Sequence, residues 1–340
     1  MAPAEIPFEY LLAAIETTRG TAIATPTRNV AAPGTLIPKG EVYFPPEARG
    51  TLVEYYRSQS VRRWVEFETD DTDLDLNAMQ FWLAMAVKGG VSATLVEAGV
   101  YKWIYTPSVT SDDLKSATMW WGDPNMQVWR AAYCMLNEFT ISADGKDTEG
   151  TKFALSGQGQ KEAKVTAPAA PAYATPLSIS PAYMDVWLEP NTTNAYGTTL
   201  ITSRVLMVEH SIPVGMRYKF GPGGVVSPPA DARTFRRTGR TKRHMTTTIE
   251  LELLDTAQYD IFDALHGQPV RMRTKHWTQN LIGATQRGYL QVDHYGPLLD
   301  LEWGEYEESN RTVKFTIPSM YDSVLGADFS IELQNATNVV

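Results

Sequence analysis

The chain has 340 residues, a net charge of −9 and a single cysteine, Cys134. This length predicts two domains of about 150–170 residues each. A net negative charge argues against a protein that binds nucleic acid over most of its surface. A single cysteine excludes an intramolecular disulfide and a cysteine-based metal site. Acidic Glu5 and Glu9 precede only a short apolar stretch, so we expect no secretory signal, and no apolar run reaches the length of a membrane span.

The first half predicts a β-rich domain with one helix. Ala22–Gly50 contains five prolines and little periodicity, which indicates a long extended arm or loop. Polar and apolar side chains alternate over Val61–Thr69, as in a strand, and the spacing in Leu76–Lys88 predicts an amphipathic helix that ends at Gly89. Further strands are expected at Val91–Glu97, Val100–Thr106, Met126–Ser142 and Thr151–Gln158.

Residues 166–182, rich in proline and alanine, predict a linker between a first domain at 1–165 and a second at 183–340. In the second half a loop at 221–243 is expected between two strands, and Asp255–His266 predicts a short helix followed by Gly267. The strands expected here are Val205–Phe220, Thr246–Leu254, Val270–Lys275, Gly288–Asp293, Leu298–Tyr306, Thr312–Pro318 and Phe329–Leu333.

The two halves repeat several short patterns in the same order. Trp64–Glu68 corresponds to Thr248–Glu252, and each is soon followed by an acidic helix start. Three further correspondences link Lys152–Ser156 with Lys314–Pro318, Gly89 with Gly267, and Ile15-Glu16…Gly20-Thr21 with Leu188-Glu189…Gly197-Thr198. The shared order favours an internal duplication over two unrelated β-domains. The predicted fold is therefore mainly β: two tandem β-sandwich domains, each with one flanking helix, plus long loops.

Sequence signatures of catalysis are missing. The five histidines form no HExxH pattern or short ligand cluster, and the chain has neither a GxSxG elbow nor a GxxxxGK[ST] phosphate loop. The adjacent Asp293 and His294 are expected to be an isolated exposed pair. Asp71, Asp73 and Asp75 alternate like the start of a calcium loop, but the turn glycine and final glutamate are absent, so carboxylates at a helix N-terminus are the simpler interpretation. We expect no catalytic residue, metal site or cofactor.

The Glu-x-Glu pairs Glu66/Glu68 and Glu250/Glu252 are candidate functional residues. A strand has a side-chain period of two, so both carboxylates of a pair share one face of a sheet. A glycosidase pair would instead flank its substrate, usually from different strands. The duplicated pairs indicate either a repeated acidic surface or a solvated outer face.

Six basic residues in one short segment form the strongest local anomaly; they are Arg233, Arg236, Arg237, Arg240, Lys242 and Arg243. Runs of this kind bind nucleic acid in some proteins. In an acidic chain they also suit self-association, with the basic loop of one subunit against an acidic surface of its neighbour. A solvated loop is the third interpretation.

Taken together, these patterns resemble the major tail-tube proteins of long, non-contractile bacteriophage tails, in the variety with two tandem tube domains. The resemblance lies in the Ile15-Glu16…Gly20-Thr21 entry, the strand-to-helix units Trp64–Gly89 and Thr248–Gly267, the long loops, and the closing strands Thr312–Pro318 and Phe329–Asn335. It spans nearly the whole chain as a match of architecture, without one diagnostic motif.

The resemblance implies a structural virion protein, made in the host cytoplasm, that forms trimeric, pseudo-six-fold rings stacked into a hollow tube. Its partners would be further copies of itself, the terminator, distal-tail and tape-measure proteins, and double-stranded DNA in transit, with no membrane. Glu66, Glu68, Glu250 and Glu252 would line the channel, while the 22–50 arm and the 221–243 loop would bridge rings.

Two other functions are compatible with the sequence. One is a β-sandwich that binds or degrades carbohydrate, with Trp120, Trp121 and Trp187 as sugar-stacking groups. The other is a different virion component, such as a capsid decoration or baseplate protein.

Overall fold

The computed structural model describes residues 6–7, 11–30, 33–45, 55, 57–69, 71–145, 150–172, 175–190, 195–201, 204–220, 234–235, 237–253, 256–307 and 310–338. Over these residues the protein is mainly β, as predicted. The elements of the first half are β1 (Ile6–Pro7), β2 (Leu11–Ile15), β3 (Arg28–Val30), β4 (Gly34–Tyr43), β5 (Gln59–Thr69), β6 (Thr72–Asp73), α1 (Leu76–Ala86), β7 (Thr94–Glu97), β8 (Val100–Tyr105), β9 (Ala117–Asp123), β10 (Gln127–Asp144), β11 (Lys152–Gly159) and β12 (Ala163–Val165). Those of the second half are β13 (Met184–Glu189), β14 (Arg204–Pro213), β15 (Met216–Lys219), β16 (Arg237–Arg240), β17 (Thr246–Glu252), α2 (Thr256–Leu265), β18 (Pro269–Leu281), β19 (Arg287–Pro297), β20 (Leu299–Glu307), β21 (Asn310–Pro318) and β22 (Phe329–Asn335).

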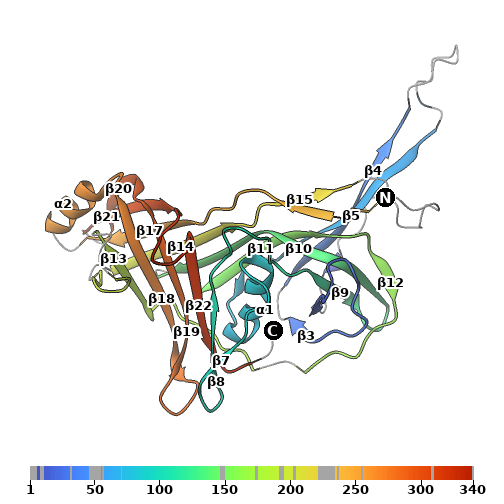
Figure 1. The fold of residues 1–340 in the computed structure, drawn as a ribbon, viewed down its shortest axis with the longest axis horizontal. Coiled ribbons are helices and arrows are strands. Elements are labelled where there is room, and N and C mark those ends of the chain that lie inside the picture. Colours follow the sequence, from blue (N-terminus) through green and yellow to red (C-terminus); the bar gives the residue numbers. More distant parts are fainter. Residues whose placement is uncertain are drawn as a thin grey trace.

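One large sheet runs through both halves of the chain (Figure 1). Its main path is β1-β4-β5-β11-β10-β14-β17-β21-β20, and β2, β3, β9 and β12 join it through β10. A second sheet, in the order β13-β18-β19-β22-β8-β7, lies against it and takes its last two strands from the first half. The two halves of the sequence therefore share both large sheets.

Each half supplies four strands of the large sheet in the same order. These sets are β4-β5-β11-β10 and β14-β17-β21-β20, all paired antiparallel, and they meet where β10 pairs with β14. In each set the second strand, β5 or β17, carries a Glu-x-Glu pair and is followed along the chain by a helix. The strand patterns that repeat in the sequence thus occupy equivalent positions in the sheet.

A bend in the chain also recurs. The long β10 pairs with β9 and β12 through its first residues and with β11 and β14 through its last. Tyr133, where the pairing changes, has a φ of 54°. In the second half only Leu298 separates β19 from β20. Asp300, the second residue of β20, has a φ of 51°. A positive φ is uncommon outside glycine, so each half makes this bend with an unusual backbone conformation.

Helix α1 lies inside the molecule, packed between β10 of the large sheet and β8 and β22 of the second (Figure 1). The prediction of an amphipathic, flanking helix was wrong at this position, because almost every side chain of α1 is buried, including Phe81 and Trp82. A helix that is apolar on all sides belongs in a core. Helix α2 packs Phe262 against Phe315, with 5.3 Å between ring centroids, and exposes Asp260 and Asp263.

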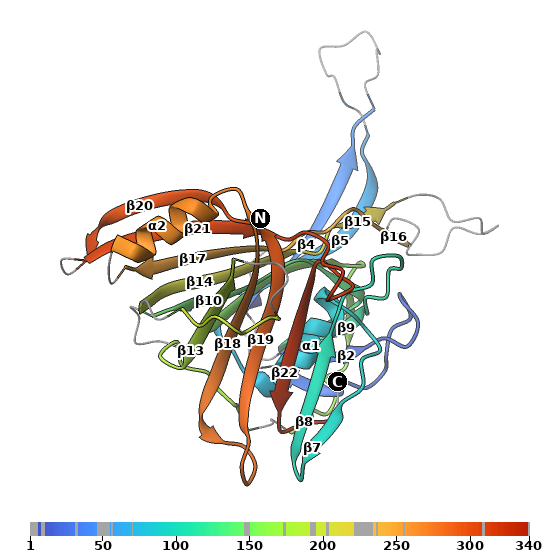
Figure 2. The ribbon, with the colours of Figure 1, turned by 60° about the vertical axis from the view of Figure 1, so that its left-hand side comes forward.

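The prediction of a long extended arm or loop without a folded element at 22–50 was wrong in part, because this range contains β3 and β4. Strand β4 pairs with β5 along its whole length, and their hairpin projects from the body (Figures 1 and 2). The first residues of β4 alternate between buried and half-buried, whereas those from Gly40 to Tyr43 are all exposed. A strand with both faces in solvent has no hydrophobic alternation, which explains why sequence periodicity missed it.

Two other predicted segments differ in detail. Gly215, with a φ of 72°, divides the predicted strand Val205–Phe220 into β14 and β15, and β16 lies inside the predicted 221–243 loop. The predicted linker is attached to the first half, because the backbone N–H of Leu76 donates to the carbonyl oxygen of Leu177 (3.0 Å).

In the described chain, neither helix is long and apolar enough to cross a membrane.

Candidate functional site

One face of the large sheet is the candidate site. Burial alternates residue by residue along β11, β14 and β17, so one face of these strands is packed in the core and the other reaches solvent. The buried face carries apolar residues such as Phe153, Val208 and Ile249, which pack into the hydrophobic core. We call the opposite side, with its hydroxyl, amide and carboxylate side chains, the open face.

All four glutamates of the repeated pairs lie on this open face. The pairing registers connect them through intervening strands, because Glu66 lies opposite Gln158 and Glu250 lies opposite Met207 and Lys314. Glu68 is exposed, and Glu66 and Glu250 are half-buried. Glu252 is only 5% exposed, because Arg204 on the neighbouring strand pairs with it at 3.2 Å. The structure thus brings the two pairs onto one surface, although they are far apart in the sequence.

Glu66 is held in place by neighbouring side chains. It accepts a hydrogen bond from Nε1 of Trp64 (2.9 Å) and lies 3.6 Å from Nζ of Lys39. The Lys39 and Glu66 side chains are each about two-fifths exposed, so this ion pair contributes little to stability. Its effect is on position, since it fixes one carboxylate of the open face.

The open face has further charges that the sequence did not single out. Its other carboxylates, placed by register with the repeated pairs, include Glu138, Asp144, Glu209 and Glu302. Its basic residues include Lys39, Lys152, Arg204 and Lys314. Hydroxyl side chains such as Thr140, Ser211 and Thr248 lie between them. The pattern was visible as alternation in each strand, but only the registers show that these strands share one face.

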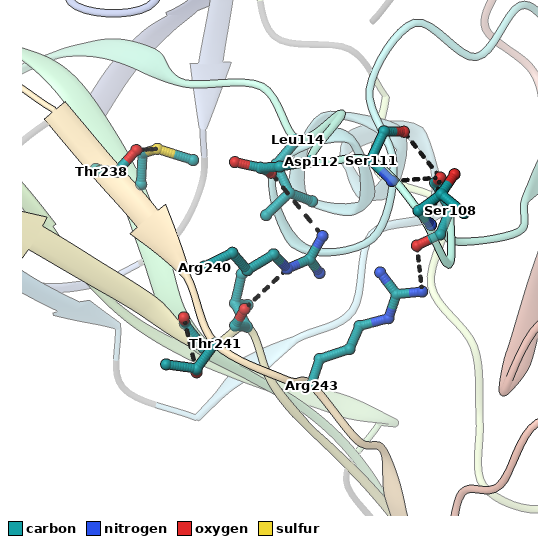
Figure 3. Close-up of polar contacts among 12 residues, drawn as sticks. Ser108, Ser111, Asp112, Leu114, Thr238, Arg240, Thr241 and Arg243 are labelled. Carbon is teal, nitrogen blue, oxygen red and sulfur yellow. Dashed lines mark hydrogen bonds and ion pairs between the residues drawn. The ribbon is translucent and has the colours of Figure 1, made fainter.

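The basic segment divides into buried and exposed members. Arg240 donates from Nε to the carbonyl oxygen of Val214 (3.3 Å) and lies 3.9 Å from Asp112 (Figure 3). Arg243 donates to the carbonyl oxygen of Ser108 (3.0 Å) and pairs with Asp328 (3.3 Å). These two guanidinium groups therefore bind the 106–115 segment within the same chain, so the prediction that they contact a neighbouring subunit loses its support.

The remaining basic residues have different outcomes. Arg237 and Lys242 are exposed, so they stay candidates for contact with a partner. Arg233 and Arg236 lie outside the described residues.

Burial lowers the pKa of Arg240, and the charge of nearby Arg243 lowers it further. Burial alone would raise the pKa of Asp112, but its hydrogen bonds and charge interaction with Arg19 outweigh that effect and lower it.

Two buried glutamates fix equivalent turns in the two halves. Glu16 accepts hydrogen bonds from the backbone N–H groups of Gly20 and Tyr133 and from the hydroxyls of Ser116 and Thr118, at 2.6–2.8 Å. Glu189 accepts from the backbone N–H of Thr198 (2.6 Å) and from the N–H and hydroxyl of Thr199. The repeated entry pattern in the sequence thus has a shared structural cause: a buried carboxylate binds the turn that follows it.

Three histidines are buried between the two sheets in the second half. His210 has hydrogen-bond contacts of 2.9 Å with the hydroxyls of Thr247 and Thr274, and so connects β14 to β17 and β18. Burial lowers the pKa of His210 well below its ordinary value, that of His276 to about 4 and that of His294 to about 3. The predicted exposure of the His294–Asp293 pair was wrong, because His294 faces the core and Asp293 pairs with Arg273 on the other face.

The acidic stretch before α1 acts at a helix terminus, as expected for Asp75. Its carboxylate accepts hydrogen bonds from the backbone N–H groups of Asn77 (2.9 Å) and Leu177 (2.8 Å). Asp71 and Asp73 are exposed. In the part of the chain that the structure describes, no three His, Cys, Asp or Glu side chains gather as a metal site.

The tryptophans proposed for sugar stacking are poorly placed for it. Trp120 and Trp121 are each 1% exposed and pack in the core, so the sequence-based proposal that they form a platform was wrong. Trp187 is half-buried, and its backbone forms an isolated β-bridge with Leu200. A carbohydrate-binding function therefore loses two of the three tryptophans that motivated it.

No family model matches the chain, and no curated protein sequence matches it. Its function must therefore be argued from the surfaces described above.

Proposed function

We propose that the chain is a structural subunit that assembles with copies of itself into rings, and that stacked rings form the tail tube of a bacteriophage. Double-stranded DNA would pass through this tube, and the protein would reside in the virion beside the other tail proteins. The proposal combines the sequence resemblance with the open face of the large sheet. It assigns the chain no catalytic role.

The observation that carries the proposal is the continuity of the open face. Carboxylates from both halves, including Glu68 and Glu250, lie on one side of a single sheet. A channel for DNA needs a wall that does not bind phosphate, and a surface with excess negative charge repels it. We infer that the open face lines the channel.

The repeated strand order supports assembly of the ring. Because β4-β5-β11-β10 and β14-β17-β21-β20 have the same pairing, one chain presents two similar units side by side. Three such chains would present six units, and head-to-tail contacts between identical chains close into a ring when the rotation fits. We therefore interpret the halves as duplicated copies of one module.

The β4–β5 hairpin supports contact between rings. It projects from the body and exposes Val42 (50%), Tyr43 (53%) and Phe44 (49%) to solvent. Several exposed apolar side chains in one place are typical of a protein contact surface. In the proposed tube this hairpin, whose strand β4 belongs to the 22–50 arm, would reach the next ring.

Cysteine accessibility tests the proposed channel. The only native cysteine, Cys134, is fully buried, and burial raises the pKa of its thiol, so it should react slowly. We expect a Glu68→Cys variant on the open face to react with a bulky maleimide as a monomer and to be protected after assembly. A Thr94→Cys variant, on the exposed β7 of the second sheet, is the control and should stay reactive.

Two results would contradict the proposal. One is a purified chain that forms no ring or tube in electron micrographs. The other is an assembly in which the Glu68→Cys variant stays as reactive as the Thr94→Cys variant.

A further inference from the structure

One end of the large sheet carries a group of exposed carboxylates. Asp260 and Asp263 are exposed on α2, and Asp300 and Glu302 are exposed on β20, the last strand of the sheet, where Glu302 is the final carboxylate of the open face. The backbone N–H of Gly267, just after α2, donates to the carbonyl oxygen of Leu298, just before β20, which brings these two elements together. Within the described part of the chain, none of the four carboxylates forms an ion pair. We call this group the acidic edge.

A second surface has the opposite charge. Strands β15 and β16 form a two-stranded ribbon whose solvent side exposes Arg217, Lys219 and Arg237. Over the described residues, none of these three side chains is engaged in an ion pair. Lys219 and Arg237 lie directly opposite each other, and like charges in that arrangement destabilise a pair of strands. We call this group the basic ribbon.

The body of the protein holds the basic ribbon in place. On its inner side the hydroxyl of Tyr218 donates to the carbonyl oxygen of Met135 (3.1 Å) and to Oδ1 of Asn137 (2.9 Å). The hydroxyl of Tyr133 also contacts that of Thr238 (3.1 Å). The uncompensated cations are therefore presented on an anchored strand pair.

The acidic edge and the basic ribbon lie at opposite ends of the molecule. In both views α2 and β20 are on the left, whereas β15 and β16 are on the right beside β4 and β5 (Figures 1 and 2). One chain cannot bring its own two surfaces together in this conformation. Two different surfaces at opposite ends suit a head-to-tail contact between copies, the kind that generates rings or filaments.

We propose that the acidic edge of one copy binds the basic ribbon of a second copy. This inference rests on the proposed function, because it names the surfaces through which neighbouring subunits of a ring meet. The cations opposite each other on the ribbon would gain carboxylate partners, and the match of charge would fix which end meets which. Such a contact weakens as salt screens the charges.

Charge reversal at each end tests the contact. The ribbon variant carries Arg217→Glu, Lys219→Glu and Arg237→Glu, and the edge variant carries Asp260→Lys, Asp263→Lys and Glu302→Lys. We expect either set alone to weaken self-association at least about tenfold in sedimentation velocity, since each places like charges face to face. A chain with both sets should recover assembly, because the complementary charges are restored in exchanged positions.

Controls separate assembly from folding. A Lys88→Glu variant, changed just after α1 and not in either group, should assemble like the wild type. Circular dichroism melting of every variant should show a folded protein, because all the altered side chains of the ribbon and edge are exposed.

The outcomes distinguish this inference from the proposed function. If the wild-type chain forms rings but a folded single-end variant does so equally well, or the combined variant does not recover, the inference is wrong and the tube proposal stands. If the wild-type chain never assembles, both are wrong. Ribbon reversal that abolishes binding of double-stranded DNA and leaves self-association intact would also overturn the inference, by identifying nucleic acid as the ribbon's partner.

Discussion

The two halves of the molecule use the same strand order around different interiors. In the first half α1 is enclosed between the sheets and packs aromatic residues such as Trp82 and Phe153. In the second half α2 exposes one side, and three histidines lie between the sheets. What the halves share is the set of strands that forms the open face. The comparison indicates that the strand order and the turns bound by Glu16 and Glu189 are held in common, whereas the helices and the residues between the sheets differ.

The largest expected difference between the halves concerns their helices. Replacing Trp82 with alanine should lower the free energy of unfolding by about 3–5 kcal/mol, because a cavity enclosed by both sheets cannot collapse. Phe262→Ala in α2 should cost less, since a helix with a solvent-exposed side can move inward. Urea unfolding of both variants measures the difference, and equal losses would show that the two helices are equally enclosed.

Acid should affect the second half through its histidines. An unfolded histidine titrates near pH 6.5, whereas His276 in the folded protein has a pKa of about 4. The unfolded chain therefore binds more protons between these values, and stability falls as the pH drops from 6.5. At pH 4 the loss from His276 is about 3 kcal/mol.

Unfolding at pH 7 and pH 4 measures this loss. A His276→Leu variant should lose less stability between the two pH values than the wild type, whereas His244→Leu, at an exposed position, should not differ from it. An unchanged acid sensitivity in the His276→Leu variant would exclude the buried ring as the cause.

The buried carboxylates should behave alike in the two halves. Glu16→Gln and Glu189→Gln should each lower stability by about 2 kcal/mol, because an amide leaves at least one buried donor without an acceptor. The exposed Glu138→Gln is the control and should change little. A large loss at only one of the two buried sites would break the equivalence that we draw between these turns.

The smallest effect is expected on the open face. Glu68→Gln combined with Glu250→Gln should change the free energy of unfolding by less than about 0.5 kcal/mol, since neither side chain is part of the core. Thermal melting checks this value. A loss of several kcal/mol would mean that these carboxylates serve the fold rather than a surface function.

The sequence predicted those elements whose environment leaves a periodic pattern. Strand β5 and helix α2 were found close to their actual bounds, because alternation and helix-end signals are local. Strand β4 was missed because both of its faces reach solvent along the projecting hairpin, and β9 because all but the last of its residues are buried. A strand without a polar face has no alternation to detect.

The candidate site was predictable in part. The period-two spacing correctly placed Glu66 with Glu68 on one face, and Glu250 with Glu252 on one face. That both pairs share the same face depends on the registers of β11, β10 and β14 between them, which no local pattern gives. The internal pairing of Arg240 and Arg243 was hidden for the same reason, since Asp112 and Asp328 are distant in sequence.

The orientation of the open face in an assembled polymer tests the central claim most directly. We predict that a cryo-electron-microscopy reconstruction of the purified, polymerised chain will show a hollow tube, with Glu66, Glu68 and Glu250 pointing into its channel. A tube in which these carboxylates lie on the outer surface, or are buried between subunits, would contradict the account.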